Sequence, residues 1–213
     1  KAVSVWDNQY MIIPLDRPEG GTSLDDETYT YSPNDITPAD VDGDGEYELI
    51  LKWEPSNSFD SGKDARHNGN VYIDCYKMNG TKLWRIDMGM NINAGAHFTQ
   101  MAAYDFDLDG KAEIALKTAP GTKDGKNNYV SEASSIEEIK NTDNSADYRH
   151  DKNGGDTGGR VLSGDEYYTV FQGNTGEALD TIYYPHSRGA ITEWGVHNSI
   201  NNKHADMMDN FPE

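Results

Sequence analysis

An acidic segment that occurs twice, each time followed by a strand-like run, constrains the fold of this chain more than any other feature. Residues 40–53 read DVDGDGEYELILKW and residues 105–118 read DFDLDGKAEIALKT, and the two copies align without a gap. The identical positions pair Asp40, Asp42, Asp44, Gly45, Glu48, Leu51 and Lys52 with Asp105, Asp107, Asp109, Gly110, Glu113, Leu116 and Lys117. An internal repeat of this kind indicates a fold built from similar units.

A second repeated pattern follows each acidic segment. Residues 71–87 (VYIDCYKMNGTKLWRID) and 168–182 (YTVFQGNTGEALDTI) each read as strand, glycine-containing turn and strand, with alternating apolar residues. The run Asn79-Gly80-Thr81-Lys82 is typical of a type I′ hairpin turn. Acidic loop, strand, connection and hairpin together predict the four antiparallel strands of a propeller blade. We therefore expect an all-β fold, a calcium-stabilised β-propeller.

The size of the chain bounds the number of such units. At about 40–50 residues per blade, the chain would supply about four blades with insertions. Residues 122–160 contain few apolar residues and many Gly, Asn, Asp and Ser, which predicts a loop-rich insertion with a short helix at SSIEEIK. We expect residues 1–213 to form one propeller region, which is either a small closed propeller or part of a larger one.

The acidic segments have the ligand pattern of calcium loops. Calcium takes six to eight oxygen ligands, and alternate residues of a tight loop direct theirs inward. The predicted ligands are the side chains of Asp40, Asp42, Asp44 and Glu48 with the Glu46 carbonyl, and those of Asp105, Asp107, Asp109 and Glu113 with the Lys111 carbonyl. Gly45 and Gly110 permit the sharp turn around the ion. We expect two structural calcium ions that fix the ends of strands.

Two other kinds of acidic loop have a similar sequence pattern. An EF-hand or dockerin-type loop needs an acidic residue at its twelfth position and a helix on each side. That position holds Leu51 and Leu116 here, and the flanking runs ELILKW and EIALKT are β-rich, which excludes it. The other interpretation is an acidic turn that binds no ion. Two copies in register, each followed by Glu and a strand, argue against it.

Charge and composition exclude several classes of function. With 18 basic and 37 acidic residues the net charge is −19, so a nucleic-acid partner is not expected. An acidic polysaccharide would need a cation to bridge it to such a surface. Cys75 is the single cysteine, so no intramolecular disulfide can form, and we expect it to be buried in the core. No run of about 18 apolar residues is present, so no membrane span is expected.

Several segments resemble one enzyme family. They are residues 31–58 (YSPNDITPADVDGDGEYELILKWEPSNS), 68–100 (NGNVYIDCYKMNGTKLWRIDMGMNINAGAHFTQ), 104–122 (YDFDLDGKAEIALKTAPGT), 146–149 (ADYR) and 161–171 (VLSGDEYYTVF). They are similar to the N-terminal propeller blades of family 11 polysaccharide lyases, the rhamnogalacturonan lyases. The resemblance covers most of residues 9–195, and KWEPSNS and AGAHFTQ make it specific. It implies an eight-bladed propeller, bound calcium, secretion and β-elimination at galacturonate in rhamnogalacturonan I.

The resemblance also indicates candidate substrate-binding residues, namely Asn34, Glu54 and His97. Glu54 stands where the family has Asp in its segment KWDPSNS, and residues 195–213 follow the family pattern less closely. The basic catalytic residues of the family fall outside this chain, so the catalytic base is left unassigned. Asn34 could instead have only a turn role in SPND, and His97 only a structural one. Lys52 and Lys117 occupy equivalent repeat positions, which favours structural roles, and Trp53, Trp84 and Trp194 are interpreted first as core residues.

Three functions remain open from the sequence. The first is an extracellular, calcium-assisted lyase that acts on pectic rhamnogalacturonan I, with further blades or chains completing the propeller. The second is a non-catalytic pectin-binding module on the same scaffold. The third is an integrin-like adhesion propeller, which would share the acidic loops but not the segments KWEPSNS and AGAHFTQ.

Overall fold

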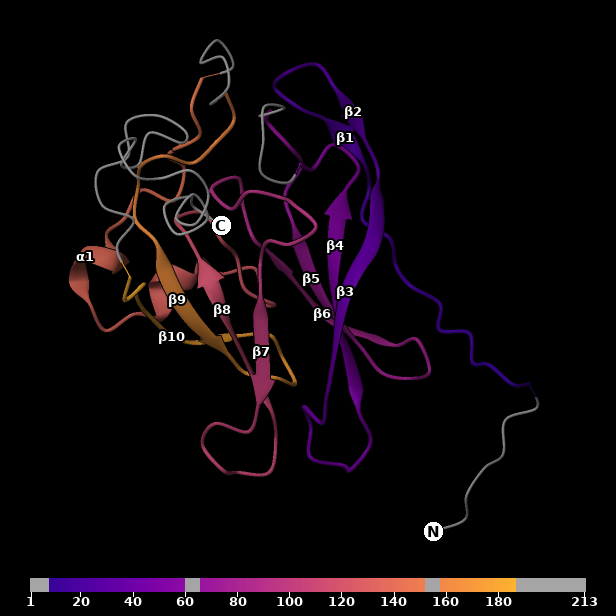
Figure 1. The fold of residues 1–213 in the computed structure, drawn as a ribbon. Coiled ribbons are helices and arrows are strands. Elements are labelled where there is room, and N and C mark those ends of the chain that lie inside the picture. Colours follow the sequence, from indigo (N-terminus) through magenta and orange to yellow (C-terminus); the bar gives the residue numbers. More distant parts are fainter. Residues whose placement is uncertain (1–7, 60–65, 152–157, 187–213) are drawn as a thin grey trace, which may run out of the picture.

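The strands form two four-stranded antiparallel sheets and one short hairpin (Figure 1). The computed structural model describes residues 8–59, 66–151 and 158–186. The strands are β1 (Gly21–Thr22), β2 (Thr28–Tyr29), β3 (Tyr31–Ala39), β4 (Glu48–Pro55), β5 (Tyr72–Tyr76), β6 (Lys82–Asp87), β7 (Met101–Tyr104), β8 (Glu113–Thr118), β9 (Tyr167–Phe171) and β10 (Ala178–Tyr183). Within these ranges the only helical pieces are the 3-10 turn η1 (Val130–Ala133) and α1 (Glu137–Lys140), and no helix is suited to crossing a membrane. The all-β expectation is confirmed.

Each large sheet is a meander of four consecutive strands, and the two sheets share one plan. Strands β3-β4-β5-β6 form sheet 1, and strands β7-β8-β9-β10 form sheet 2. Their registers are equivalent, since Ile50 lies opposite Cys75 and Ala115 lies opposite Val170. The described residues thus contain two blade-sized sheets, and the expectation of about four was wrong. In the connection from β8 to β9, the described residues 119–151 and 158–166 add no strand to either sheet, which accounts for part of the difference.

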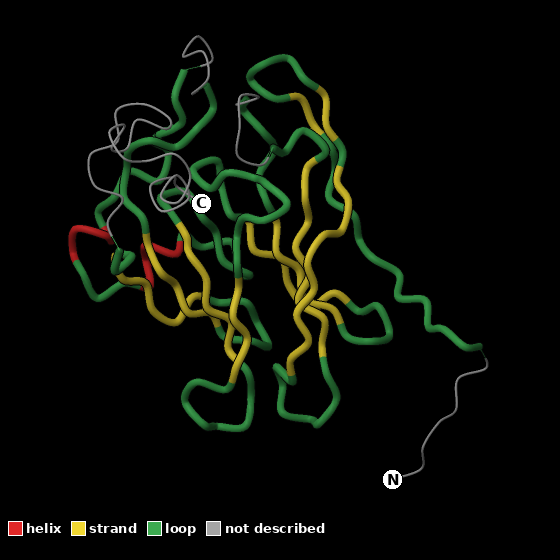
Figure 2. The backbone as a smooth tube through the Cα atoms, viewed as in Figure 1, coloured by secondary structure: helices red, strands yellow, loops and turns green. Residues whose placement is uncertain are grey.

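The main apolar core lies between the two sheets, whose strands stand side by side in Figure 2. Ile50 and Ile73 of sheet 1 and Ile114 and Phe171 of sheet 2 are fully buried in it. Trp84 closes one side, and its indole Nε1 donates a 2.7 Å hydrogen bond to a backbone carbonyl of the β9–β10 turn. Trp53, Trp84 and Cys75 are buried, as expected, whereas Trp194 lies outside the described residues.

The turn between β5 and β6 differs from the one expected. A type I′ turn needs positive φ at both central residues, but Asn79 is not among the residues with positive φ, and Gly80 has φ 85°. The Gly80 N–H donates to the Lys77 carbonyl at 2.8 Å, and the register shifts between Cys75 and Tyr76. The turn is therefore a three-residue loop, in which a β-turn centred on Met78 and Asn79 is followed by Gly80 in the left-handed conformation of a bulge, and the type I′ prediction was wrong.

A row of threonine hydroxyls attaches the long connection after β8 to sheet 2. Thr118, Thr169 and Thr181, one from each of β8, β9 and β10, are fully buried. Their Oγ1 atoms lie 2.7 Å and 3.0 Å apart along the row, and the Thr181 hydroxyl donates to the carbonyl of Val130 at 2.8 Å. The row therefore ends on η1. The helix expected within SSIEEIK is present as α1.

A buried carboxylate organises the face of sheet 1 that is turned away from sheet 2. Asp74 on β5 is fully buried. It accepts hydrogen bonds from the Trp53 indole (2.8 Å), from the Tyr76 hydroxyl (2.6 Å) and from two guanidinium nitrogens of Arg85 (2.7 Å each). Arg85 also donates to the backbone carbonyl of Asp16 at 2.5 Å. The network thus ties the N-terminal segment to the sheet.

The two acidic loops occupy equivalent places, between the first and second strands of each sheet, and both lie at the lower end of the molecule in Figure 1. They contact each other, since the Ala112 N–H donates to the Asp40 carbonyl at 2.8 Å. The loops differ at their fourth position, where Gly43 has φ 78° and Leu108 has φ 65°. The second loop thus holds a leucine in a backbone conformation that favours glycine.

Replacing Leu108 with glycine is expected to stabilise the protein by about 1 kcal/mol, because the left-handed conformation strains a residue that carries Cβ. The Leu108 side chain is 80% exposed, so its removal forfeits little packing. Urea unfolding would measure the change. The reverse substitution Gly43→Leu is the matched control and should destabilise; equal destabilisation by both substitutions would contradict the explanation.

Candidate functional site

The two acidic loops fold in the same way because each uses its own carboxylates to bind its backbone. The Asp40 and Asp105 carboxylates each accept the N–H of the glycine five residues later, both at 2.9 Å. The glutamates at the start of β4 and β8 accept backbone N–H groups too: Glu48 from Val41 at 3.1 Å, and Glu113 from Phe106 at 2.9 Å. The loops are thus held in shape around a carboxylate-lined centre.

Three carboxylates converge in each loop. Ligand oxygens of Asp40, Asp42 and Glu48 lie within 4.8 Å of one another, and so do those of Asp105, Asp107 and Glu113. An all-oxygen set with three carboxylates fits calcium. Burial is the main reason that the pKa of Glu48 lies above its ordinary value, and a bound cation would favour the ionised form. The two triads contain the side-chain ligands predicted at the first, third and ninth positions.

The predicted ligands at the fifth position lie outside these triads. The carboxylates of Asp44 and Asp109 instead accept the N–H of Glu46 and Lys111, each at 2.8 Å. The carbonyls of Glu46 and Lys111 stay predicted ligands.

A lysine distinguishes the first triad from the second. The Lys77 ammonium lies 2.6 Å from the Asp42 carboxylate and 3.8 Å from that of Glu48. Its hydrogen bond lowers the pKa of Asp42. Gln172 occupies the equivalent place after β9, where its N–H pairs across the turn with the Glu177 carbonyl as that of Lys77 does with Thr81. The Lys77 ammonium therefore competes with a cation for the carboxylates of the first site, whereas the second site has the neutral Gln172 in the equivalent place.

Replacing Lys77 with glutamine is expected to raise the calcium affinity of the first loop about two- to fivefold. The interaction free energy of a solvent-exposed charge pair corresponds to a change in Kd of this size. Terbium luminescence titration would measure it. The matched control is Gln172→Lys, which should weaken binding in the second loop. Unchanged affinities in both variants would contradict competition by the lysine.

A second polar group surrounds Lys52 at the other end of sheet 1. Lys52 is fully buried, and its ammonium donates to the carbonyls of Gly95 (3.2 Å), Ala96 (3.3 Å) and Phe98 (2.7 Å). It also lies 3.5 Å from the Asp35 carboxylate and 3.8 Å from that of Glu54. Because its hydrogens are engaged, Lys52 holds the 95–98 segment in place, in agreement with the structural role expected for it.

The candidate substrate-binding residues lie in this region. Glu54, near the end of β4, is 7% exposed, and the Asn34 Oδ1 atom is buried without a hydrogen-bond partner in the bulge of β3. His97 is exposed on the segment that Lys52 holds. Six residues of strand separate Glu48 from Glu54, which is about 20 Å. The carboxylate triads therefore do not reach this group.

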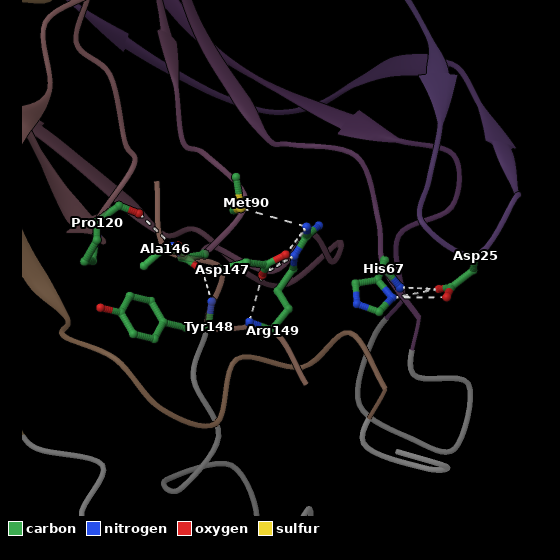
Figure 3. A network of polar contacts seen from close by, with 9 residues as sticks. Asp25, His67, Met90, Pro120, Ala146, Asp147, Tyr148 and Arg149 are labelled. Atoms are coloured by element: carbon green, nitrogen blue, oxygen red, sulfur yellow. Dashed lines mark hydrogen bonds and ion pairs between the residues drawn. The ribbon is translucent and has the colours of Figure 1, made fainter. Parts of the chain in front are cut away.

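A third polar group, which the sequence analysis did not identify, lies where loops of the two sheets approach each other (Figure 3). The His67 ring is 4% exposed, and its Nδ1 lies 3.1 Å and 3.2 Å from the two carboxylate oxygens of Asp25. On the other side, Arg149 binds both oxygens of Asp147 at 2.8 Å and 2.7 Å. Burial disfavours the ionised form of Asp147, but Arg149 brings its pKa below the ordinary value. Asp147 and Arg149 lie in the segment ADYR that carried part of the family resemblance, whereas no sequence motif marks Asp25 or His67.

The chain matches the family model described as "Rhamnogalacturonan lyase family 11, C-terminal domain" over residues 10–207. The sequence resemblance had indicated the N-terminal part of the catalytic propeller, whereas this description names the C-terminal domain of the family. Two similar proteins from Bacillus subtilis (strain 168) are "Rhamnogalacturonan endolyase YesW", 53% identical over 90% of this chain, and "Rhamnogalacturonan exolyase YesX", 48% identical over 99%. The chain spans only 28% and 31% of their lengths.

Solved structures agree with the sequence comparison. The crystal structure of rhamnogalacturonan lyase YesW superposes with a TM-score of 0.77 at 51% identity, covering 90% of this chain and 30% of that one. The Bacillus licheniformis rhamnogalacturonan lyase PL11 gives 0.77 at 49% identity, covering 92% and 30%. With a family model matched over nearly all of its length, the chain belongs to rhamnogalacturonan lyase family 11.

Proposed function

We propose that this chain is part of a lyase that cleaves the rhamnogalacturonan I backbone of pectin by β-elimination at galacturonate, on a calcium-stabilised β-propeller. Membership of the family supports the reaction class, and the relatives named above are an endolyase and an exolyase. Two consecutive four-stranded meanders with equivalent acidic loops support the propeller and its calcium sites. We also propose an extracellular location, where calcium is abundant enough to fill sites of modest affinity.

The reaction sets clear requirements. The proton at C5 of galacturonate is α to a carboxylate, so it becomes acidic only when the charge of that carboxylate is neutralised. A calcium ion bound at the uronate would supply this neutralisation. A basic group must then accept the proton. Lys52 is unsuited to this role because its ammonium is buried and donates to three carbonyls.

The observation that carries the assignment is the group around Asn34 and Glu54. A buried amide oxygen without a partner is costly, by about 1–3 kcal/mol, unless something supplies a donor or a cation. A sugar hydroxyl or a calcium ion would do so at Asn34. Glu54 lies beside it on the paired strand β4, and the segment carrying His97 is held nearby through Lys52. We therefore assign Asn34, Glu54 and His97 to substrate binding and positioning.

Replacing Asn34 with alanine is expected to lower kcat/KM about tenfold, the loss of about 1.4 kcal/mol of transition-state stabilisation. Initial rates on rhamnogalacturonan I, measured in the ultraviolet as unsaturated uronate forms, would show it. Asn8→Ala is the control, because Asn8 is exposed and belongs to no strand, and it should leave the rate unchanged. Turnover that stays the same in Asn34→Ala would leave Asn34 with only a turn role.

The same assay with calcium and again with a chelator tests the function as a whole. Growth of the signal that depends on calcium would support a lyase. If no signal forms but the polysaccharide still retards the protein in an affinity gel, the chain acts as a pectin-binding module. Absence of both signal and retardation would leave neither interpretation standing.

A further inference from the structure

We propose that Lys52 is the positioning residue of the saccharide site: its one buried ammonium sets the relative places of Asn34, Glu54 and His97. This role depends on the proposed function, which assigns those three residues to the sugar. It goes beyond the support that Lys52 gives to the 95–98 segment, because the charge of the lysine then determines how well a sugar is aligned.

The candidate residues come from three separate elements, and the Lys52 ammonium lies where the three meet. Asn34 is in the irregular part of β3, next to Asp35, whose carboxylate is 3.5 Å from the ammonium. Glu54 follows two residues after Lys52 on β4, so both side chains lie on one face of the strand, and its carboxylate is 3.8 Å from the ammonium. His97 belongs to the segment whose carbonyls accept the hydrogen bonds of the ammonium.

Hydrogen bonds and charge have different parts in this arrangement. An ammonium has three hydrogens, and three carbonyls of the 95–98 segment account for them. The two carboxylates are thus attracted to Lys52 by charge. Water screens the attraction to Glu54, whose side chain is 9% exposed, less than the attraction to Asp35, whose side chain is 62% exposed. The Glu54 carboxylate is therefore the group whose position depends most on the charge of the lysine.

Among the described residues, five oxygen atoms surround the Lys52 nitrogen, three from carbonyls and two from carboxylates. Oxygen atoms that carry negative charge repel one another unless a cation lies between them. Here the cation is part of β4, so the fold fixes its place and no ion concentration affects it. Removing the charge would allow Asp35 and Glu54 to move apart, together with the strands that carry them.

The segment that carries His97 needs such support, because its backbone is strained. Thr99 directly follows the segment and has φ 60°, which is rare for a residue branched at Cβ. At the start of the segment, a Cβ on Gly95 would lie 2.6 Å from the Phe98 ring. Strained backbone persists only where neighbouring contacts hold it. The hydrogen bonds of Lys52 therefore hold His97 in a conformation that the segment would not keep by itself.

Lys117 offers a matched comparison, because it occupies on β8 the repeat position that Lys52 occupies on β4. Its side chain is also largely buried, at 19% exposed, and its ammonium lies 2.5 Å from the Glu166 carboxylate. Glu166 is not a candidate for sugar binding. The two lysines thus share a place in the repeat and differ in the groups that their charge holds.

Kinetics of the full-length polypeptide test the role of Lys52. In Lys52→Met, which keeps an apolar stem but no charge, we expect kcat on rhamnogalacturonan I to fall at least about tenfold, because a loosened site aligns the sugar less often. We expect KM to rise as well. Lys117→Met is the control and should keep both constants. Urea unfolding would show that each variant is folded.

A second variant separates the charge of the lysine from its packing. Lys52→Ala leaves a cavity that propylammonium would fill, and the ammonium end of that cavity lies beside the exposed Asp35. We expect added propylammonium to restore turnover in a saturable way. Propanol has a similar size and no charge, so it should not restore turnover.

Three results would overturn the role of Lys52. Unchanged kcat and KM in folded Lys52→Met would leave the lysine with packing alone. An equal loss in Lys117→Met would show a general effect of removing a buried lysine. Rescue of Lys52→Ala by propanol as much as by propylammonium, or by neither, would show that the charge does not place the sugar-binding groups.

The unsubstituted polypeptide separates this role from the proposed function. If it forms no unsaturated uronate, lyase activity is excluded, and retardation in an affinity gel that contains the same polysaccharide is compared instead. Weaker retardation of Lys52→Met than of Lys117→Met would then still support the role. Equal retardation of both variants and of the unsubstituted polypeptide would overturn it.

Discussion

Replacing Asp74 with alanine is expected to lower the free energy of unfolding by about 3–5 kcal/mol, the cost of breaking a buried ion pair at one partner. The substitution would leave the Trp53 indole and the Tyr76 hydroxyl without their acceptor. The Arg85 guanidinium would lose its carboxylate and keep its hydrogen bond to the Asp16 carbonyl and its contact with the Tyr72 ring. Since unpaired buried donors are costly, the loss of unfolding free energy should exceed the loss caused by the cavity alone that the missing carboxylate leaves.

Chemical denaturation, followed by tryptophan fluorescence, would measure this loss. Asp16→Ala is the matched control: its carboxylate lies on the same face and pairs with Lys82, but it is largely exposed. The control should therefore cost no more than about 1 kcal/mol. If both variants lose the same small amount, the buried network is not what holds the N-terminal segment on sheet 1.

Removing calcium is expected to lower the melting temperature by about 10–20 °C. An ion present at 100 times its Kd stabilises the fold by about 2.7 kcal/mol per site, and about 1 kcal/mol corresponds to 2–4 °C in a chain of this size. Two such sites give the stated range. Without the ions, three carboxylates within 4.8 Å repel one another at the start of β4 and again at the start of β8.

Calorimetry with a chelator, and again after calcium is restored, would measure the shift. The double variant Asp42→Asn, Asp107→Asn should respond to neither treatment, since each loop then lacks a converging carboxylate. Calcium binding should also weaken as the pH falls toward the pKa of Glu48, which burial raises above 4.5. A melting temperature that a chelator leaves unchanged would exclude both ions as structural elements.

The sequence predicted the parts of this fold that depend on local patterns. The acidic loops, the strands that follow them and the hairpins after 71 and 168 all lie where the repeat placed them. The type of the turn between β5 and β6 and the number of four-stranded sheets were predicted less well. The turn at Asn79 includes Gly80 as a third loop residue, which an Asn-Gly pair alone does not reveal. The described residues 119–151 and 158–166 carry no sequence periodicity that shows how little sheet they contain.

The polar groups outside the loops could not be predicted for a different reason. The partners of Lys52 are backbone carbonyls 43 to 46 residues away, and any sequence has carbonyls there. The Asp25–His67 pair spans 42 residues and depends on the β1–β2 hairpin folding over the loop before β5. Asn34 and Glu54 were identified through family resemblance; composition and spacing carry no signal for them.

The threonine row of sheet 2 bears on how the chain avoids misfolded alternatives. Because the Val130 carbonyl can only accept, Thr181 must donate to it, so each hydroxyl along the row donates in one direction toward η1. Successive side chains on a strand point to opposite faces, so a one-residue slip of β9 would remove its hydroxyl from the row altogether. A slipped β9 would then bury the Thr118 hydroxyl without its partner and take from Thr181 the hydrogen bond that Thr169 donates. The row thereby disfavours a misaligned pairing of β9. It contributes more to the free-energy gap between the correct and the misaligned sheet than to the stability of the correct sheet itself.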